Sequence, residues 1–150
     1  MFDLTGKTAL ITGSSQGIGK VIAKCFADNG AKVFIHGSSS MVKCKSVADE
    51  IGENAKAVIA DLSLDGCAEK LYEQTGNVDI LVLNASVQYR RSWDEITGEE
   101  FDKQVRVNLK SSLELIQKYA PHMKEQKWGR IVTIGSVQQH KPHKDMAIYA

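Results

Sequence analysis

The feature that most constrains the fold of this chain is a regular alternation of short apolar runs with segments of helical periodicity. Runs rich in Val, Ile and Leu occur near residues 8–12, 31–37, 55–62, 78–86 and 129–136. Continuous apolar runs are typical of strands that are buried on both faces, and the intervals between these runs are long enough for helical crossovers. The sequence therefore predicts an α/β protein built on a parallel sheet.

Helical periods fill the intervals near residues 17–30, 41–51, 64–76 and 98–126. The first of them places apolar side chains on one helical face: Ile18, Val21, Ile22, Cys25 and Phe26. In the last, the simplest interpretation of the apolar side chains is a stripe that faces the core: Val105, Leu109, Leu113 and Ile116. Pro121 cannot donate an interior backbone hydrogen bond, so we expect it to kink or shorten this helix.

Together these elements predict a Rossmann-type doubly wound parallel sheet with strand order 3-2-1-4-5. No internal repeat, low-complexity tract or linker interrupts the pattern, so we interpret residues 1–150 as a single dinucleotide-binding domain. The complete arrangement has a sixth strand, and without it the fifth strand would be a bare edge. We therefore expect the chain to be the N-terminal part of a longer single-domain enzyme, lacking the C-terminal strands of the full fold.

The composition argues against several classes of partner. Nineteen Lys and Arg residues against eighteen Asp and Glu residues leave a net charge of +1, which gives no overall attraction to nucleic acid or an anionic membrane. The start of the sequence lacks a secretory signal pattern, and no apolar run approaches the ~18 residues of a membrane span. Cys25, Cys44 and Cys67 are odd in number and lack CxxC spacing, which suits reduced thiols better than a disulfide framework. We expect a cytoplasmic protein without nucleic-acid or membrane partners.

Three histidines raise the question of a metal site. His140 and His143 stand in the short stretch HKPH, and His36 lies far from them in the sequence. No ligands of matching spacing occur elsewhere in the chain, so we expect no metal and place the HKPH stretch in a solvated loop.

The most informative motif is TGSSQGIG at residues 12–19, between the first strand and the first helix. Gly13 supplies the freedom that a sharp strand-to-helix turn needs, Gly17 lets the backbone approach a pyrophosphate, and Gly19 lets the helix pack closely on the sheet. The helix N-terminus then presents N–H groups and the positive end of its dipole to phosphate. The alternative is a glycine-rich turn without a ligand, which the position of the motif disfavours.

With this turn, the chain resembles the short-chain dehydrogenase/reductase family over all 150 residues, and most nearly its bacterial 3-oxoacyl-carrier-protein reductases and sugar-acid dehydrogenases. The matching motifs stand in the family's order, mostly at strand ends: TGSSQGIG, Asp61-Leu62, Asn84-Ala85, Asn108, and Ser136 thirteen residues before Tyr149. One motif departs from the family pattern, because NNAG reads LNAS at residues 83–86. Each motif is short, and their combination is specific.

The resemblance implies a nicotinamide dinucleotide cofactor and the residues that would bind it. The residues that would line the adenosine ribose, pyrophosphate and nicotinamide side are Gly13, Ser15, Gln16, Gly17, Ile18 and Gly19. Asp61 would accept a hydrogen bond from the adenine amino group, with Leu62 against the ring. Asn84 and Ala85 would pass beneath the ribose.

The choice between NAD and NADP should be decided after the second strand, where the sequence reads HGSSS. An acidic residue at this point would hold the ribose 2′-hydroxyl of NAD, whereas hydroxyl or basic groups accept the 2′-phosphate of NADP. Ser38 and Ser39 can donate to phosphate and Lys43 is nearby, so we expect NADP(H) to be favoured over NAD(H). Gln16 argues the other way, because NADP-preferring relatives often have a basic residue there.

The resemblance also implies a reaction, the interconversion of a ketone and a secondary alcohol by hydride transfer. Tyr149 would act as general acid and base, Ser136 would polarise the carbonyl, and Asn108 would help to position a proton-relay water. A phenol has a pKa near ~10 and needs a cation beside it to work as a base. The family supplies a lysine four residues after the tyrosine, on the same helical face and beyond the last residue of this chain.

Two functions remain open at this point. The enzyme predicts a small-molecule carbonyl or alcohol substrate and, as in many relatives, a homo-oligomer that is a dimer or a tetramer. If the natural protein ends at Ala150, the sequence fits instead a non-catalytic dinucleotide-binding module, which would bind nucleotide without turnover.

Overall fold

The computed structural model describes residues 3–150, and in that range the predicted alternation of strands and helices is present. The elements in chain order are β1 (Thr8–Ile11), α1 (Gly17–Asp28), β2 (Lys32–Gly37), α2 (Met41–Ile51), β3 (Ala55–Ile59), α3 (Cys67–Thr75), β4 (Ile80–Leu83), α4 (Gly98–Val105), the π-helical segment η1 (Arg106–Lys110), α5 (Ser111–Glu125), β5 (Arg130–Thr133) and the 3-10 segment η2 (Val137–Gln139).

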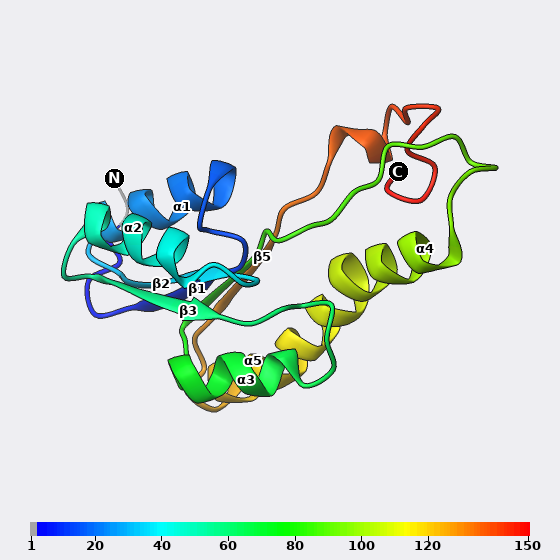
Figure 1. The fold of residues 1–150 in the computed structure, drawn as a ribbon. Helices are drawn as coiled ribbons and strands as arrows, with labels where there is room; N and C mark the ends of the chain where they lie inside the picture. The colour runs from blue at the N-terminus through cyan, green and yellow to red at the C-terminus, as the bar shows by residue number, and fades with distance from the viewer. Residues whose placement is uncertain (1–2) are drawn as a thin grey trace.

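All five strands form one parallel sheet in the order β3-β2-β1-β4-β5, which confirms the predicted order. In the centre, Ile11 of β1 is paired with Ile35 of β2 on one side and with Val82 of β4 on the other. Helices α1 and α2 cover one face of the sheet, and α3 and α5 cover the other (Figure 1). Because the strands are parallel, the loops that follow them gather at one edge of the sheet.

The core consists of two apolar clusters, one on each face of the sheet. Ala9 and Ile11 of β1 belong to the cluster beneath α1 and α2, whereas Leu10 between them belongs to the cluster beneath α3 and α5. This alternation is the two-residue period of a strand, and it explains why β1 is apolar at every position. In the second cluster the fully buried ring of Tyr119 places its hydroxyl 2.8 Å from Thr75 Oγ1, and burial raises the pKa of Tyr119 to about 12.

Helix α1 packs on the sheet through smaller residues than its apolar pattern suggests. Gly19 and Ala23 are buried, whereas Ile18 and Val21 are 64% and 68% exposed. Cys25 is also exposed, and of the expected stripe only Ile22 and Phe26 pack against the core. The helix approaches the sheet closely at Gly19, so its buried face is centred on the glycine and the alanine.

The predicted long helix is present, but its core stripe differs from the expected one. The fully buried residues are Gln104, Ser111, Leu115 and Tyr119, with Met123 nearly so. The expected stripe of Val105, Leu109 and Leu113 is exposed instead, and only Ile116 packs partly against the core. The helix continues through Pro121 to Glu125, so the proline does not shorten it, and its departure from α-helical geometry is the π-helical turn of η1.

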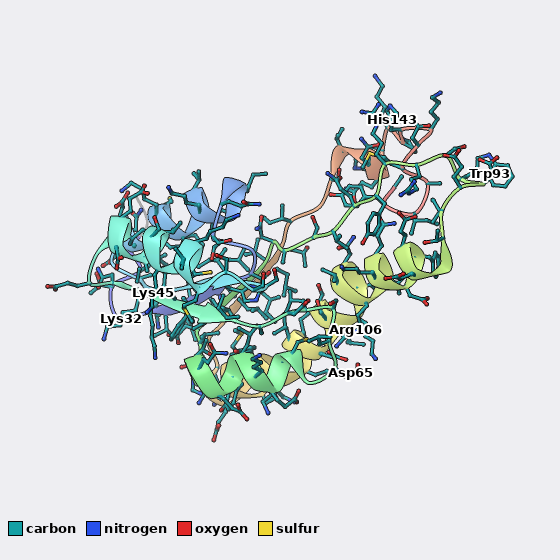
Figure 2. The ribbon with its side chains drawn as sticks, in the orientation of Figure 1. Lys32, Lys45, Asp65, Trp93, Arg106 and His143 are labelled. Atoms are coloured by element: carbon teal, nitrogen blue, oxygen red, sulfur yellow. The ribbon has the colours of Figure 1, made fainter. Side chains whose placement is uncertain are left out.

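Two segments that are far apart in the sequence extend together beyond the sheet, over α4 (Figure 1). Residues 86–97 and residues 134–150 are joined where the Arg91 N–H donates to the Asp145 carbonyl at 2.8 Å. Figure 2 shows Trp93 at the outer tip of this extension and His143 on its upper side. Among residues 3–150, no helix has both the length and the apolar character needed to cross a membrane.

Candidate active site

A cavity of about 760 Å³ lies at the carboxyl edge of the sheet. Its walls are the turn after β1, the ends of β2 and β3, the segment after β4, and the segment after β5 together with Tyr149. Helix α4 and η1 contribute Lys103 and Val107. The position is the one where open α/β sheets bind ligands, and the volume is in the range of small-molecule and cofactor sites.

Most of the predicted site residues line this one cavity. They are Gly13, Ser15, Gln16, Gly17, Ile18, Ser38, Asp61, Leu62, Asn84, Ala85, Ser136 and Tyr149. Three others do not line it. Gly19 is buried behind the turn, Ser39 is exposed, and the Asn108 side chain is bound to the backbone of Val87.

The glycines of the turn have different structural roles. Gly13 has a φ of +66°, and a Cβ there would come 2.9 Å from the Ala85 Cα. Gly19 has an ordinary helical φ, but a Cβ there would lie only 2.6 Å from both Asn84 Nδ2 and the Gly13 oxygen. Gly17 has a φ of +56° and open space where its Cβ would be. The turn is therefore shaped by backbone conformation at Gly13 and Gly17 and by close packing at Gly13 and Gly19.

The β4 side of the turn is held by Thr12 and Asn84. Asn84 Nδ2 donates to the Thr12 oxygen at 2.9 Å and to the Gly13 oxygen at 3.3 Å. In return, the buried Thr12 Oγ1 accepts from the N–H groups of Asn84 and Ala85, at 2.9 and 3.0 Å. The asparagine of the LNAS motif thus fixes the shape of the glycine turn.

The β2 side of the turn is held by His36, which is buried in the strand. The Gly13 N–H donates to His36 Nδ1 at 3.0 Å, and the Ser14 N–H donates to the His36 carbonyl at 2.9 Å. The His36 N–H donates to Ser14 Oγ at 2.9 Å. His140 is exposed and His143 is half-buried in the segment that extends beyond the sheet.

Asp61 follows β3, and its carboxylate is anchored by the next turn. Its Oδ1 accepts from the Ser63 N–H at 2.9 Å and from the Ser63 hydroxyl at 2.7 Å. Burial acts to raise the pKa of Asp61, but the Ser63 hydrogen bonds and the charge of Lys103 lower it overall. An ionised carboxylate therefore lies at the wall of the cavity, next to the lysine that α4 contributes.

The loop after Asp61 is tied to the π-helical segment by Arg106 (Figure 2). Arg106 Nη2 donates to the Leu64 carbonyl at 2.5 Å and lies 3.5 Å from Asp65 Oδ1, while its Nη1 pairs with Glu114 Oε2 at 3.0 Å. These contacts hold the loop beside η1. The neighbouring Asn108 accepts from the Val87 N–H and donates to the Val87 oxygen, both at 2.8 Å.

The cavity is also lined by Ser136 and Tyr149. Ser136 has extended backbone after β5, and its Oγ accepts from the Gln138 N–H at 3.2 Å. That bond leaves the Ser136 O–H free to donate elsewhere. Tyr149 is half-buried, and its N–H donates to the Met146 oxygen at 3.0 Å. A hydroxyl donor and a phenol thus line the same cavity as the glycine turn.

The parallel sheet, its strand order and the cavity beside the glycine turn define a protein of the Rossmann-type nucleotide-binding class. The family model described as short chain dehydrogenase matches residues 7–150, and the chain belongs to that family.

Several proteins of known name match most of this chain in sequence or in structure. The 3-oxoacyl-(acyl-carrier-protein) reductase FabG of Rickettsia prowazekii is 36% identical over 137 residues, which are 91% of this chain and 56% of that protein. A crystal structure of a 3-oxoacyl-(acyl-carrier-protein) reductase from Agrobacterium tumefaciens with NADP bound matches with a TM-score of 0.92 and 38% identity, over 98% of this chain and 59% of that one.

A third match carries the other nicotinamide cofactor. The crystal structure of 3-ketoacyl-(acyl-carrier-protein) reductase from Brucella melitensis complexed with NADH has a TM-score of 0.89 and 36% identity, over 98% of this chain and 64% of that one. The chain thus spans a little over half the length of the curated relatives that it matches first.

Proposed function

We propose that this chain forms the dinucleotide-binding domain and part of the catalytic site of an NAD(P)H-dependent oxidoreductase that interconverts a ketone and a secondary alcohol. The observation that carries the proposal is a single cavity that is lined by the glycine turn and by Ser136 and Tyr149. Family membership and the cofactor-bound relatives support the same reaction class.

The walls of the cavity fit a dinucleotide. The Gln16 side chain makes no cap hydrogen bond, and the first turn of α1 has no acidic side chain. The N–H groups and the positive dipole end at the N-terminus of α1 are therefore available to a pyrophosphate. A Cβ at Gly17 would be strained by the left-handed φ, and glycine there keeps the backbone accessible. Asp61 Oδ1 is engaged by Ser63, and the other carboxylate oxygen would accept from the adenine amino group.

When bound, the nicotinamide would supply or accept the hydride. The Ser136 hydroxyl would donate a hydrogen bond to the substrate oxygen, and this donation is compatible with the bond that its Oγ accepts from Gln138. The Tyr149 hydroxyl would give a proton to that oxygen during reduction and take it back during oxidation. Asn108 would act through Val87, because its side-chain amide is already bonded at both ends to that residue's backbone.

We further propose that NADP(H) is favoured over NAD(H). Gly37 and Ser38 line the cavity after β2, and no carboxylate follows them before α2 to repel a 2′-phosphate. The relatives include one with NADP and one with NADH, so both cofactors need testing.

Three free cysteines, of which Cys44 and Cys67 are buried, support a reducing, cytoplasmic location.

The test is turnover by the full-length protein with NADPH or NADH and a panel of ketones that includes a 3-oxoacyl thioester. Tyr149→Phe should lower kcat/KM by about 10²- to 10⁴-fold, the usual contribution of a positioned proton donor, while the Kd of the cofactor stays nearly unchanged. Tyr72→Phe is the matched control, because the Tyr72 hydroxyl bonds to Asn77, which does not line the cavity. A Tyr149→Phe enzyme with full activity would refute the assignment, and cofactor binding without any turnover would favour a non-catalytic module.

A further inference from the structure

His36 lies directly behind the cofactor turn, where it is only 2% exposed and is absent from the cavity wall. Its ring joins two segments that belong to the candidate adenosine site. His36 Nδ1 is 3.0 Å from the Gly13 nitrogen, in the turn after β1, and Nε2 is 2.9 Å from the Ala60 oxygen, just before Asp61. The histidine thus connects the glycine turn to the residue after β3 through two hydrogen bonds.

The two partners fix the protonation state of the ring. A backbone N–H can only donate, so His36 Nδ1 must carry a lone pair toward Gly13. A carbonyl can only accept, so Nε2 must carry the hydrogen toward Ala60. The ring is therefore neutral and in the Nε2–H tautomer. A proton added at Nδ1 would set two N–H donors against each other at the first glycine of the turn.

The contacts on the backbone of β2 extend this arrangement. Ser14 Oγ accepts from the His36 N–H at 2.9 Å and donates to the Ile11 oxygen at 2.7 Å. The Ser14 N–H donates to the His36 carbonyl at 2.9 Å. Both N–H groups that follow Thr12 are therefore satisfied by His36, one by the ring and one by the backbone. Displacement of the ring would free the peptide that gives Gly13 its left-handed conformation.

We infer that His36 is a positioning residue for the cofactor: the neutral ring holds the glycine turn in the shape that binds pyrophosphate, and protonation of the ring releases it. The inference rests on the proposed binding of a nicotinamide dinucleotide at this turn. It predicts that affinity for the cofactor falls when His36 gains a proton.

The surroundings of the ring set the direction of the pH dependence. Burial lowers the pKa of His36, against the opposing effects of the Ala60 hydrogen bond and the Asp61 charge. Asp61 in turn faces Lys103 of α4, and the Cys44 side chain of α2 lies against Gly37, the residue after His36. Affinity should thus stay constant as pH falls to the usual histidine pKa near ~6.5 and decrease only below the lowered pKa of His36, by up to about tenfold for each further pH unit.

Two substitutions distinguish the effect of losing the hydrogen-bond acceptor at Nδ1 from the effect of protonating the His36 ring. In His36→Asn, the side-chain oxygen lies close to the position of Nδ1 and can accept from the Gly13 N–H, but it does not titrate. In His36→Phe, the ring volume is kept and the acceptor is lost. His122→Asn is the control, since this half-buried histidine of α5 is not in the cavity wall.

The experiment measures the Kd of NADP⁺ and NAD⁺ by isothermal titration calorimetry on the full-length protein, from about pH 5 to about pH 8, the range in which histidine titrates. The quantity compared is the ratio of wild-type to variant Kd at each pH, because titration of the ligand cancels in that ratio. We expect His36→Phe to weaken binding by about tenfold or more even at neutral pH, because both hydrogen bonds of the ring are lost. The Kd of the wild type divided by that of His36→Asn should rise as pH falls. The Kd of the wild type divided by that of His122→Asn should stay constant.

The outcomes are distinguishable. If the wild-type protein binds neither nucleotide, the proposed function fails. If it binds and the ratio to His36→Asn is the same at every pH, or His36→Phe binds as well as wild type, the inference about His36 is wrong. ¹⁵N NMR of the wild-type imidazole provides a test that does not depend on folding of the variants. The Nε2–H tautomer at neutral pH, with titration shifted to lower pH by cofactor, is expected, and an Nδ1–H tautomer would overturn the inference.

Discussion

Gly19 is the residue at which α1 approaches the glycine turn most closely. Replacement by alanine would place a Cβ 2.6 Å from the Gly13 oxygen, which is backbone and cannot move without changing the turn. We expect Gly19→Ala to lower the free energy of unfolding by about 1–3 kcal/mol, as overpacking usually does, and to weaken cofactor binding. Urea denaturation and a cofactor titration measure the two effects.

Gly98 is the matched control for Gly19, because it also stands in the first turn of a helix. An added Cβ at Gly98 meets no atom within 4 Å, and its φ is not in the left-handed region. Gly98→Ala should leave the stability unchanged or raise it by up to about 1 kcal/mol through helix propensity. Equal losses for the two alanine variants would mean that close packing is not the reason for glycine at position 19.

Single residues differ in how well sequence reveals their roles. Gly13, Gly17 and Gly19 could be predicted because their spacing and their position after a strand are local signals. His36 could not be placed in the same way, because its ring bonds to residues 23 and 24 positions away and only the folded sheet brings these together. Thr12 and Asn84, which are 72 residues apart, form a second example of a clamp that no local pattern encodes.

At the scale of elements, the segment that departs most from its sequence pattern is the helix formed by α4, η1 and α5. Its exposed side has an apolar stripe of Phe101, Val105, Leu109 and Leu113, with Leu109 69% exposed. Its buried side includes the polar residues Gln104 and Ser111. Helical periodicity finds both sides but cannot tell which one faces the sheet, and the richer apolar side is the one that faces outward.

We propose that a second copy of the chain covers this outward apolar stripe. The double variant Leu109→Asp, Leu113→Asp should therefore have a lower mass in solution than the wild type, because carboxylates would replace the apolar side chains of the proposed interface. Analytical ultracentrifugation of the full-length protein measures the change in mass. Ser112→Asp and Gln117→Asp, singly, test whether charge elsewhere on this helix has the same effect, and an unchanged mass in the double variant would exclude the stripe as the interface.

At the scale of the whole molecule, the strand order could be predicted because right-handed crossovers between parallel strands, with helices on both faces of the sheet, give this doubly wound order. The position of residues 134–150 beside residues 86–97 could not, since it depends on contacts such as the one between Arg90 Nη2 and His143 Nε2, 3.2 Å apart. These segments follow different strands, and only the sheet edge brings their starting points together. The parts of the site that come from them are therefore the least visible in the sequence.

At the edge of the sheet opposite the cavity, the half-buried residue Asp79 makes several hydrogen bonds. Its Oδ2 accepts from the N–H and the hydroxyl of Thr8, at 2.9 and 3.0 Å, and its Oδ1 accepts from Gln126 Nε2 at 2.9 Å. The backbone of Asp79 also pairs with Thr8 and with Arg130. Asp79 thus joins the start of β1 to the residue after α5 through its carboxylate, and contacts the start of β5 through its backbone oxygen.

This carboxylate should govern the acid stability of the molecule. Burial acts to raise the pKa of Asp79, but hydrogen bonds from Gln126 and Thr8 and the charge of Lys7 lower it overall. Because the pKa is lower in the folded than in the unfolded protein, the stabilisation is present above the unfolded value near ~3.9 and is lost as pH falls through the folded value. Asp79→Asn should therefore be less stable than wild type at neutral pH and should converge with it in acid. Thermal unfolding from about pH 7 to about pH 3 measures this, with the exposed Asp49→Asn as control. Parallel curves for wild type and Asp79→Asn would show that ionisation of this carboxylate does not stabilise the junction between β1 and the end of α5.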